Sequence, residues 1–211
     1  MDITGNQITA AIGLAGINRK ELADFVGISS TALSNIETGN TKSPKTITMS
    51  RIVQFINMKN VEFIDGGVRT VKSGTRVLNG AKDFKEFIYD VYETVKNGGD
   101  ICVSNVDERQ FERWQGKHAQ DYLSKMEKID GLRFRALIKE GDDYFTANSY
   151  AEYRSVPEDN FTGVPTYKYG TKTAQIIFMD NDVSVILTNN EQLSAAAEKQ
   201  FNRAWKNAKL V

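Results

Sequence analysis

The sequence has few of the residues that build metal centres and covalent cross-links. Among 211 residues, Cys102 is the single cysteine and His118 the single histidine. An intramolecular disulfide and a cysteine metal cluster are therefore excluded, as is any mechanism that needs two imidazoles in one chain. We expect no metal, no cofactor and a reducing, cytoplasmic compartment.

Long apolar runs are also missing. No window approaches ~18 consecutive apolar residues, and the N-terminus lacks a basic run followed by an apolar stretch. We expect neither a membrane span nor a signal peptide, and no membrane partner. With 40% hydrophobic and 26% charged residues, the composition is that of an ordinary globular chain. Its length suits one large domain or two small ones.

The formal net charge of zero conceals an uneven distribution. Residues 1–80 contain nine basic and six acidic side chains, so they carry +3 and the remainder carries −3. A small basic unit followed by an acidic one indicates that only the first meets a polyanion.

Glycines mark a division of the chain. The stretch 66–74 begins with two glycines, ends with a third and has no helical apolar stripe, which favours a linker. The apolar residues from Phe84 to Val95 then recur at helical spacing and stop before Gly98. We predict a first domain over residues 1–65, a linker over 66–80 and a second domain over 81–211.

The first domain is predicted to be all-α, with four or five short helices and no convincing strand. Asn18 can cap a second helix, with Glu21 completing a capping box, and Ser29 can cap a third. Between these helices, Gly27 permits a tight reversal. Two short helices joined in this way match the geometry that places a second helix in the major groove of DNA.

Three segments resemble the helix-turn-helix of the Cro and lambda-repressor (XRE) family. They are residues 16–23 (Gly-Ile-Asn-Arg-Lys-Glu-Leu-Ala), 26–29 (Val-Gly-Ile-Ser) and 33–39 (Leu-Ser-Asn-Ile-Glu-Thr-Gly). Residues 61–65 resemble the short strand-like tail that ends such domains, so the resemblance covers about residues 5–70. It implies a sequence-specific transcription regulator, expected to repress, with double-stranded DNA as its partner in the nucleoid.

The resemblance also implies a DNA interface. Its candidate residues are Arg19, Ser29, Ser30, Thr31, Ser34, Asn35, Asn40, Lys42 and Lys45. In the family the position of Arg19 contacts phosphate, and the first turn of the third helix contacts base edges and phosphates. Asparagine can read adenine through a bidentate pair, whereas serine and threonine discriminate poorly. Asn40, Lys42 and Lys45 would hold backbone phosphates.

These recognition residues imply weak readout by one copy of the chain. A monomer would neutralise few phosphates and bind in a salt-sensitive way. We therefore expect a homodimer on a palindromic operator, with half-sites ~10 base pairs apart. The second domain is the expected place of dimerisation.

The second domain is predicted to be an α/β sandwich. A strand at 100–104 precedes a helix over about 107–128, in which His118 falls on the apolar stripe and is expected to be packed. A strand over 132–138, a hairpin turning at 180–182 and a terminal helix follow. This order of helices and strands is typical of α/β sandwiches.

Four further segments resemble the phospholipase D-like domain of archaeal TrmB-type regulators. They are residues 154–157, 165–172, 185–189 and 201–206. Phospholipase D catalysis needs a His-x-Lys pair from each of two half-sites. Ala119 and Gln120 follow His118, and the segment from Gly170 to Lys172 has glycine in place of histidine. We therefore expect no catalytic residue and no enzyme.

The same resemblance suggests a remnant anion pocket. Arg135, Arg154, Tyr169 and Lys172 are expected to converge on it and to bind a small anionic effector. The alternative is that the two arginines form salt bridges in an acidic domain.

Other function classes stay open at this point. The chain could be a host–phage or toxin–antitoxin interaction protein, or a phospholipase D-like nuclease targeted by its first domain. An autoproteolytic repressor is disfavoured, because no convincing Ala-Gly cleavage site stands before a Ser/Lys dyad.

Overall fold

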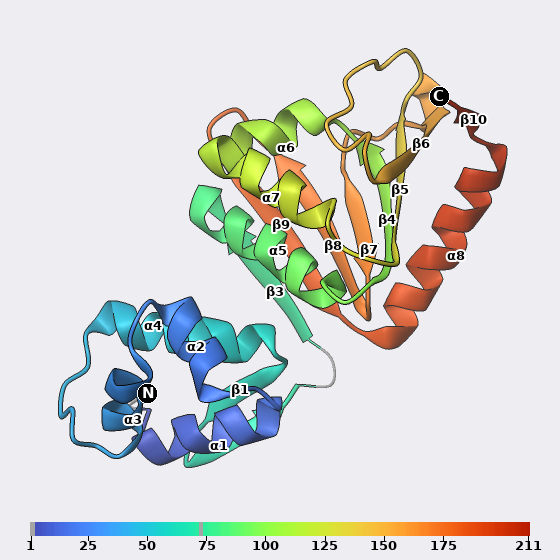
Figure 1. Cartoon of the computed structure of the whole chain (residues 1–211). Helices are drawn as coiled ribbons and strands as arrows, with labels where there is room; N and C mark the ends of the chain where they lie inside the picture. The colour runs from blue at the N-terminus through green and yellow to red at the C-terminus, as the bar shows by residue number, and fades with distance from the viewer. Residues whose placement is uncertain (1–2, 72–73) are drawn as a thin grey trace. The chain divides into compact units, whose positions relative to one another are not determined.

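The computed structural model describes residues 3–71 and 74–211 (Figure 1). Contacts divide the chain into two compact units, Met1–Lys72 and Ser73–Val211, here called the N-terminal and C-terminal units. Within the described ranges, no helix has the length and apolar character needed to cross a bilayer.

The N-terminal unit holds four helices and a hairpin. Its elements are α1 (Gly5–Ala15), α2 (Arg19–Val26), α3 (Ser30–Glu37), α4 (Thr46–Met58), β1 (Val61–Ile64) and β2 (Gly67–Thr70). The helices confirm the predicted helical domain, and the antiparallel pair of β1 and β2 adds a small sheet. Apolar side chains of all four helices form its core, among them Ile8, Leu22, Leu33 and Phe55, each fully buried.

The segment 66–80, for which we expected a linker, contains two strands. They are β2 and β3 (Gly74–Asn79), while residues 72 and 73 lie outside the described residues. Val68 of β2 pairs with Phe63 of β1, and both pack on the helical core. These strands are only four and six residues long, too short for alternation to be distinguished from a glycine-rich connection.

The C-terminal unit is built on one mixed sheet. Its elements are β3, α5 (Gly80–Val95), β4 (Gly99–Val106), α6 (Glu108–Gln115), the 3-10 turn η1 (Gly116–His118), α7 (Ala119–Met126), β5 (Leu132–Lys139), β6 (Ala151–Val156), the 3-10 turn η2 (Glu158–Asn160), β7 (Thr166–Tyr169), β8 (Lys172–Phe178), β9 (Val183–Asn189), α8 (Glu191–Asn207) and β10 (Lys209–Leu210). The strand order is β10-β6-β5-β4-β7-β8-β9-β3, in which β4, β5 and β6 run parallel. This confirms the α/β expectation.

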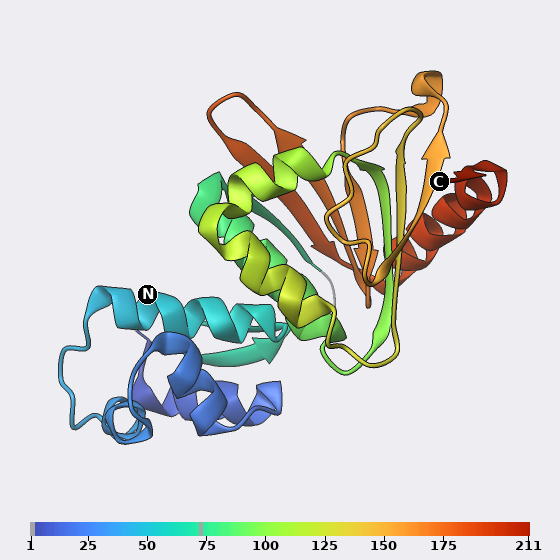
Figure 2. The ribbon, with the colours of Figure 1, turned by 45° about the horizontal axis from the view of Figure 1, so that its top comes forward.

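Helices cover both faces of this sheet. Figures 1 and 2 show α5, α6 and α7 on one side and α8 on the other. The larger core lies under α5 and includes Phe87, Ile101 and Tyr169, whereas a smaller one joins Cys102 and Leu137 to Phe201 and Trp205 of α8. Successive strand residues thus enter different cores.

The predicted helix over 107–128 is interrupted. The 3-10 turn η1 separates α6 from α7, and it begins at Gly116, whose φ is +55°. In a continuous helix His118 would share a stripe with Phe111 and Trp114, but the interruption changes the helical phase. His118 is consequently exposed, and the expectation of a packed histidine is wrong.

The first turn of α1 holds the N-terminal unit together. Thr4 and Gln7 form a capping box, in which Gln7 N donates to Thr4 Oγ1 at 3.3 Å and Thr4 N donates to Gln7 Oε1 at 2.9 Å. Gln7 Nε2 also donates to the carbonyls of Ile64 and Gly67, each at 3.0 Å. One buried amide therefore caps the helix and joins it to the hairpin.

Gly5 lets the same turn approach the end of α3. A Cβ on Gly5 would lie 2.1 Å from the carbonyl oxygen of Glu37 and 2.6 Å from that of Ile36. Both obstacles are backbone atoms, so no rotamer change can relieve the contact.

We predict that Gly5→Ala lowers the free energy of unfolding of the N-terminal unit by at least ~2 kcal/mol, because α1 must move away from α3. Gly13→Ala is the matched control on the same helix, since a Cβ there meets nothing within 4 Å. That control should be stabilising by up to ~1 kcal/mol. Urea unfolding followed by circular dichroism measures both, and equal stability of the two variants would contradict the packing described.

Candidate nucleic-acid interface

The turn between α2 and α3 is closed by capping groups. Asn18 Oδ1 accepts from Glu21 N at 2.9 Å at the start of α2, and Gly27 ends that helix in the left-handed conformation, with φ +78°. Ser29 Oγ then accepts from Ala32 N at 3.1 Å at the start of α3. The N-caps at Asn18 and Ser29 and the reversal at Gly27 are confirmed. The predicted capping box is wrong, because the Glu21 carboxylate pairs with Lys59 Nζ at 3.0 Å instead of turning back to Asn18. The hydroxyl of Ser29 is occupied in capping.

A buried carboxylate sets the position of α3. The side chain of Glu37, at the end of this helix, is 5% exposed and accepts from Arg19 Nε at 2.9 Å and from Thr9 Oγ1 at 2.8 Å. It therefore joins α1, α2 and α3. Its hydrogen bond and charge raise the pKa of the Arg19 guanidinium, which is half exposed. Since Nε faces Glu37, the outer end of this guanidinium is aimed away from the core.

The outer face of α3 is polar and uncharged. Ser30, Thr31, Ser34 and Asn35 are exposed, and none of these side chains makes a hydrogen bond to another described residue. The one acidic residue of the helix, Glu37, is buried and its carboxylate is paired with Arg19. This face thus offers donors and acceptors without an anionic charge that would repel phosphate.

The loop after α3 adds two cations. Thr41 N donates to the carbonyl of Asn35 at 3.0 Å, which holds the loop against the end of the helix. Asn40, Lys42 and Lys45 are exposed. Among the described residues, neither lysine has an ion-pair partner, so both charges can meet an external anion.

The four candidate anion ligands of the C-terminal unit do not converge. Tyr169 Oη donates to Asp90 Oδ2 at 2.8 Å, and Lys172 Nζ lies 2.6 Å from Asp90 Oδ1, all under α5. Arg135 and Arg154 lie on the other side of the sheet, against α8. The expected pocket is wrong, because the register places Tyr169 level with Ile101 and Phe134, so that Arg135, the next residue, faces the other side of the sheet.

Both arginines are also occupied. Arg135 donates to Asn202 Oδ1 at 2.9 Å and to Cys102 Sγ at 3.2 Å, and Arg154 donates to the carbonyl of Trp205 at 2.9 Å. The guanidinium of Arg154 stacks over the indole of Trp205, with 4.7 Å from Cζ to the ring centroid. Burial raises the pKa of the Cys102 thiol. The alternative expectation was that both arginines form salt bridges. Among the described residues this holds for Arg154, whose Nη2 lies 3.5 Å from Glu152 Oε1, and not for Arg135.

Sequence reasoning missed one supporting residue of the N-terminal unit. Arg51, on α4, donates from Nη1 to the carbonyl of Val26 at 3.0 Å and so closes the C-terminal end of α2. An arginine in the middle of an exposed helix face carries no sequence signal of this role.

Comparison with known proteins identifies the N-terminal part. A family model described as helix-turn-helix matches residues 9–63. The N-terminal unit therefore contains an XRE-type helix-turn-helix domain. No curated protein sequence matches the chain.

Several solved structures are similar to the chain. TrmBL2, described as an archaeal chromatin protein with a novel mode of DNA binding, is 14% identical with a TM-score of 0.44, over 65% of this chain and 54% of TrmBL2. This chain thus spans about half the length of TrmBL2. Nuc, a phospholipase D family member from Salmonella typhimurium, is 9% identical with a TM-score of 0.47, over 66% of this chain and 98% of Nuc. NucT from Helicobacter pylori is 6% identical with a TM-score of 0.45, over 66% and 99%.

The buried pair of Asp90 and Lys172 yields a stability prediction. Their side chains are 2% and 8% exposed, so Lys172→Met leaves an uncompensated buried carboxylate and should cost about 3–5 kcal/mol of unfolding free energy. The double variant Lys172→Met with Asp90→Leu removes both charges and should recover most of this loss. Urea unfolding of the single and double variants measures the difference. A single variant as stable as the parent would contradict a buried pair.

Proposed function

We propose that this chain is a sequence-specific DNA-binding transcription regulator that represses as a homodimer on a palindromic operator. The observation that carries the proposal is the outer face of α3. Its exposed side chains, Ser30, Thr31, Ser34 and Asn35, make no hydrogen bond to another described residue. The cations of the following loop, Lys42 and Lys45, are close to it in the sequence. The helix-turn-helix match over residues 9–63 supports DNA as the partner.

Within this interface the roles differ. Asn35 carries a side-chain amide that can pair with adenine, and it lies on the exposed face one turn after the start of α3. Arg19, Lys42 and Lys45 contribute sequence-independent phosphate contacts. Asn40 and the backbone around Ser29 border the same contact region. Because each copy has one side chain, Asn35, that can distinguish a base strongly, a specific operator site requires two copies of the chain.

The C-terminal unit offers a surface for the second copy. Helix α8 packs mainly on β8, β7, β4 and β6, so it covers this face in part at β8, whereas the main helix contact of β9 and β3 is with α5 on the opposite face. Figure 2 shows α8 on the β6 side of the sheet, away from β3. Val77 on β3 is 59% exposed and Ile177 on β8 is 40% exposed. We call the outward face of β8, β9 and β3 the open sheet face.

The open sheet face is suited to pairing with itself. The side chains that alternate onto it are Thr75, Val77, Thr173, Gln175, Ile177, Ser184, Ile186 and Thr188. All are uncharged, so two copies of the face can meet without placing like charges opposite each other. Exposed apolar residues on such a face are typical of protein interfaces. We therefore assign the dimer contact to this face.

We further propose that the chain is not an enzyme. Where the sequence resemblance puts a catalytic histidine, Gly170 has φ +51°, and a Cβ there would lie 2.8 Å from Thr94 Cγ2. The nearby Lys172 ammonium is paired with Asp90 and is buried. These contacts support the absence of phospholipase D chemistry, and we assign the C-terminal unit to dimerisation and to sensing a small anionic effector.

The DNA proposal is tested by selecting bound sequences from random duplexes with the full chain, Asn35→Ala and Arg19→Ala. We expect a palindromic motif from the parent chain. Asn35→Ala should relax one base position of each half-site, at a cost of about 1–3 kcal/mol in discrimination. Arg19→Ala should weaken all sites and reduce the salt slope by about one. Because it also removes the cation beside the buried Glu37, Lys42→Ala is run as a second phosphate-contact variant that leaves this pair intact and should lower the salt slope by the same amount. Failure to select any motif at low salt, with neither substitution mattering, would overturn the proposal.

The dimer proposal is tested by placing a charge on the open sheet face. Ile177→Asp buries two like charges in a self-paired interface and should shift sedimentation from dimer to monomer at micromolar concentration. Leu210→Asp is the matched control, because Leu210 is 75% exposed on β10 at the other edge of the sheet. A monomeric parent chain, or a dimer that survives Ile177→Asp, would refute this assignment.

A further inference from the structure

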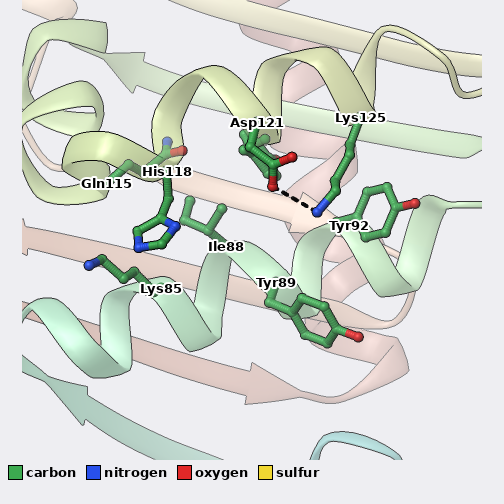
Figure 3. A pocket seen from close by; sticks show the side chains of 9 residues that line it. Lys85, Ile88, Tyr89, Tyr92, Gln115, His118, Asp121 and Lys125 are labelled. Carbon is green, nitrogen blue, oxygen red and sulfur yellow. Dashed lines mark hydrogen bonds and ion pairs between the residues drawn. The ribbon is translucent and has the colours of Figure 1, made fainter. Parts of the chain in front are cut away.

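A cavity of about 240 Å³ lies between α5 and the segment formed by α6, η1 and α7 (Figure 3). Three tyrosines and an isoleucine supply its apolar wall, namely Tyr89, Tyr92, Tyr122 and Ile88. Its volume is slightly below the ~300 Å³ at which drug-sized pockets begin, so it suits a ligand with a single ring. The walls thus favour a small aromatic body.

Two residues that line this cavity carry a polar atom that is itself shielded from solvent and has no protein partner among the described residues. Gln115 is 7% exposed, and its Oε1 accepts no hydrogen bond from any described residue. The hydroxyl of Tyr122, likewise buried, has none either. Burial raises the pKa of Tyr122 well above its ordinary value, so this hydroxyl stays protonated. Leaving a buried acceptor unpaired costs about 1–3 kcal/mol, and a donor on a ligand removes that cost.

The cationic groups of the cavity are of two kinds. Lys125 Nζ is paired with Asp121 Oδ2 at 2.7 Å, as the dashed line in Figure 3 marks. Lys85 of α5 and His118 of η1 have no ion-pair partner among the described residues, and Figure 3 shows both at the end of the cavity away from Tyr92. An ammonium and an imidazole N–H from opposite walls are therefore available to one anionic group.

We propose that this cavity binds a small aromatic carboxylate that also carries a hydroxyl. The ring packs against the tyrosine wall and the carboxylate is held by Lys85 and His118. The Gln115 side chain turns toward the cavity on binding, so that the ligand hydroxyl donates to its Oε1, which is shielded in the unliganded structure. The inference rests on the sensing role proposed above for the C-terminal unit. It places the effector in this cavity, and not at Arg135, Arg154, Tyr169 and Lys172, which lie on opposite faces of the sheet.

Isothermal titration of the full chain with 2-, 3- and 4-hydroxybenzoate tests the site. At least one isomer should bind saturably, and the corresponding hydroxybenzamide, which lacks the negative charge, should bind about tenfold more weakly. Lys85→Met should weaken hydroxybenzoate binding about tenfold and leave the hydroxybenzamide unaffected. Lys82→Met is the matched control, because Lys82 is exposed on the same helix and does not line the cavity.

A second variant reports on the hydroxyl. Gln115→Leu should weaken binding of the hydroxybenzoate but not that of benzoate, which lacks the donor. Thermal unfolding of each variant shows whether the fold is retained. Lys85 is exposed, so Lys85→Met is expected to fold. This variant therefore still tests the site if Gln115→Leu fails to fold. Absence of saturable binding by all three isomers, or equal binding by the parent chain and Lys85→Met, would overturn the site.

Measuring operator affinity with and without the bound hydroxybenzoate distinguishes failure of this site from failure of the proposed function. If the ligand binds in the cavity and changes affinity for the selected operator, both the site and the sensing role are supported. If it binds but operator affinity stays constant, the site stands and the sensing role is lost. If a motif is selected but nothing binds in the cavity, the regulator stands and the site is refuted.

Discussion

The two-residue repeat of a β-strand is the constraint on which the C-terminal unit depends. Adjacent strand residues face opposite sides of the sheet, so each pair of neighbours is divided between two environments. Tyr169 reaches Asp90 under α5, whereas Lys168 beside it pairs with Glu198 of α8 at 2.8 Å. This alternation decides which core a residue joins and which charged groups can meet.

The two faces of the sheet are covered unequally, and function follows from the difference. Three helix segments and the larger core cover the α5 side, and the cavity with Gln115 and His118 lies among those helices. On the other side α8 packs on β4, β6, β7 and β8, so it covers the open sheet face only in part. The ligand site and the dimer contact that we propose are therefore on different surfaces of the unit. Helix α5 contributes to both the sheet packing and the cavity, because Phe87 and Val91 pack on the sheet while Lys85 and Tyr89 line the cavity.

In the N-terminal unit the comparable constraint is the buried carboxylate of Glu37. Arg19 and Thr9 satisfy it, and the absence of a side chain on Gly5 lets α1 reach the same point. Because the contacts that position α3 come from its inner side and its ends, the polar groups on its outer face are not used for stability. The helix can therefore be rigid and still have Ser30, Thr31, Ser34 and Asn35 free for an external partner.

The local features of this protein follow from residues that are close together in the sequence. Asn18, Gly27 and Ser29 predict the ends of α2 and α3, and the apolar spacing from Phe84 predicts α5, because caps and helical periodicity depend on residues a few positions apart. The tertiary structure decided what these elements bring together. The sheet places β3 beside β9, more than a hundred residues later, and the interruption at Gly116 turns His118 outward. Strand order, the separation of Arg135 from Lys172 and the cavity beside Gln115 arise from packing between distant segments, which no local pattern encodes.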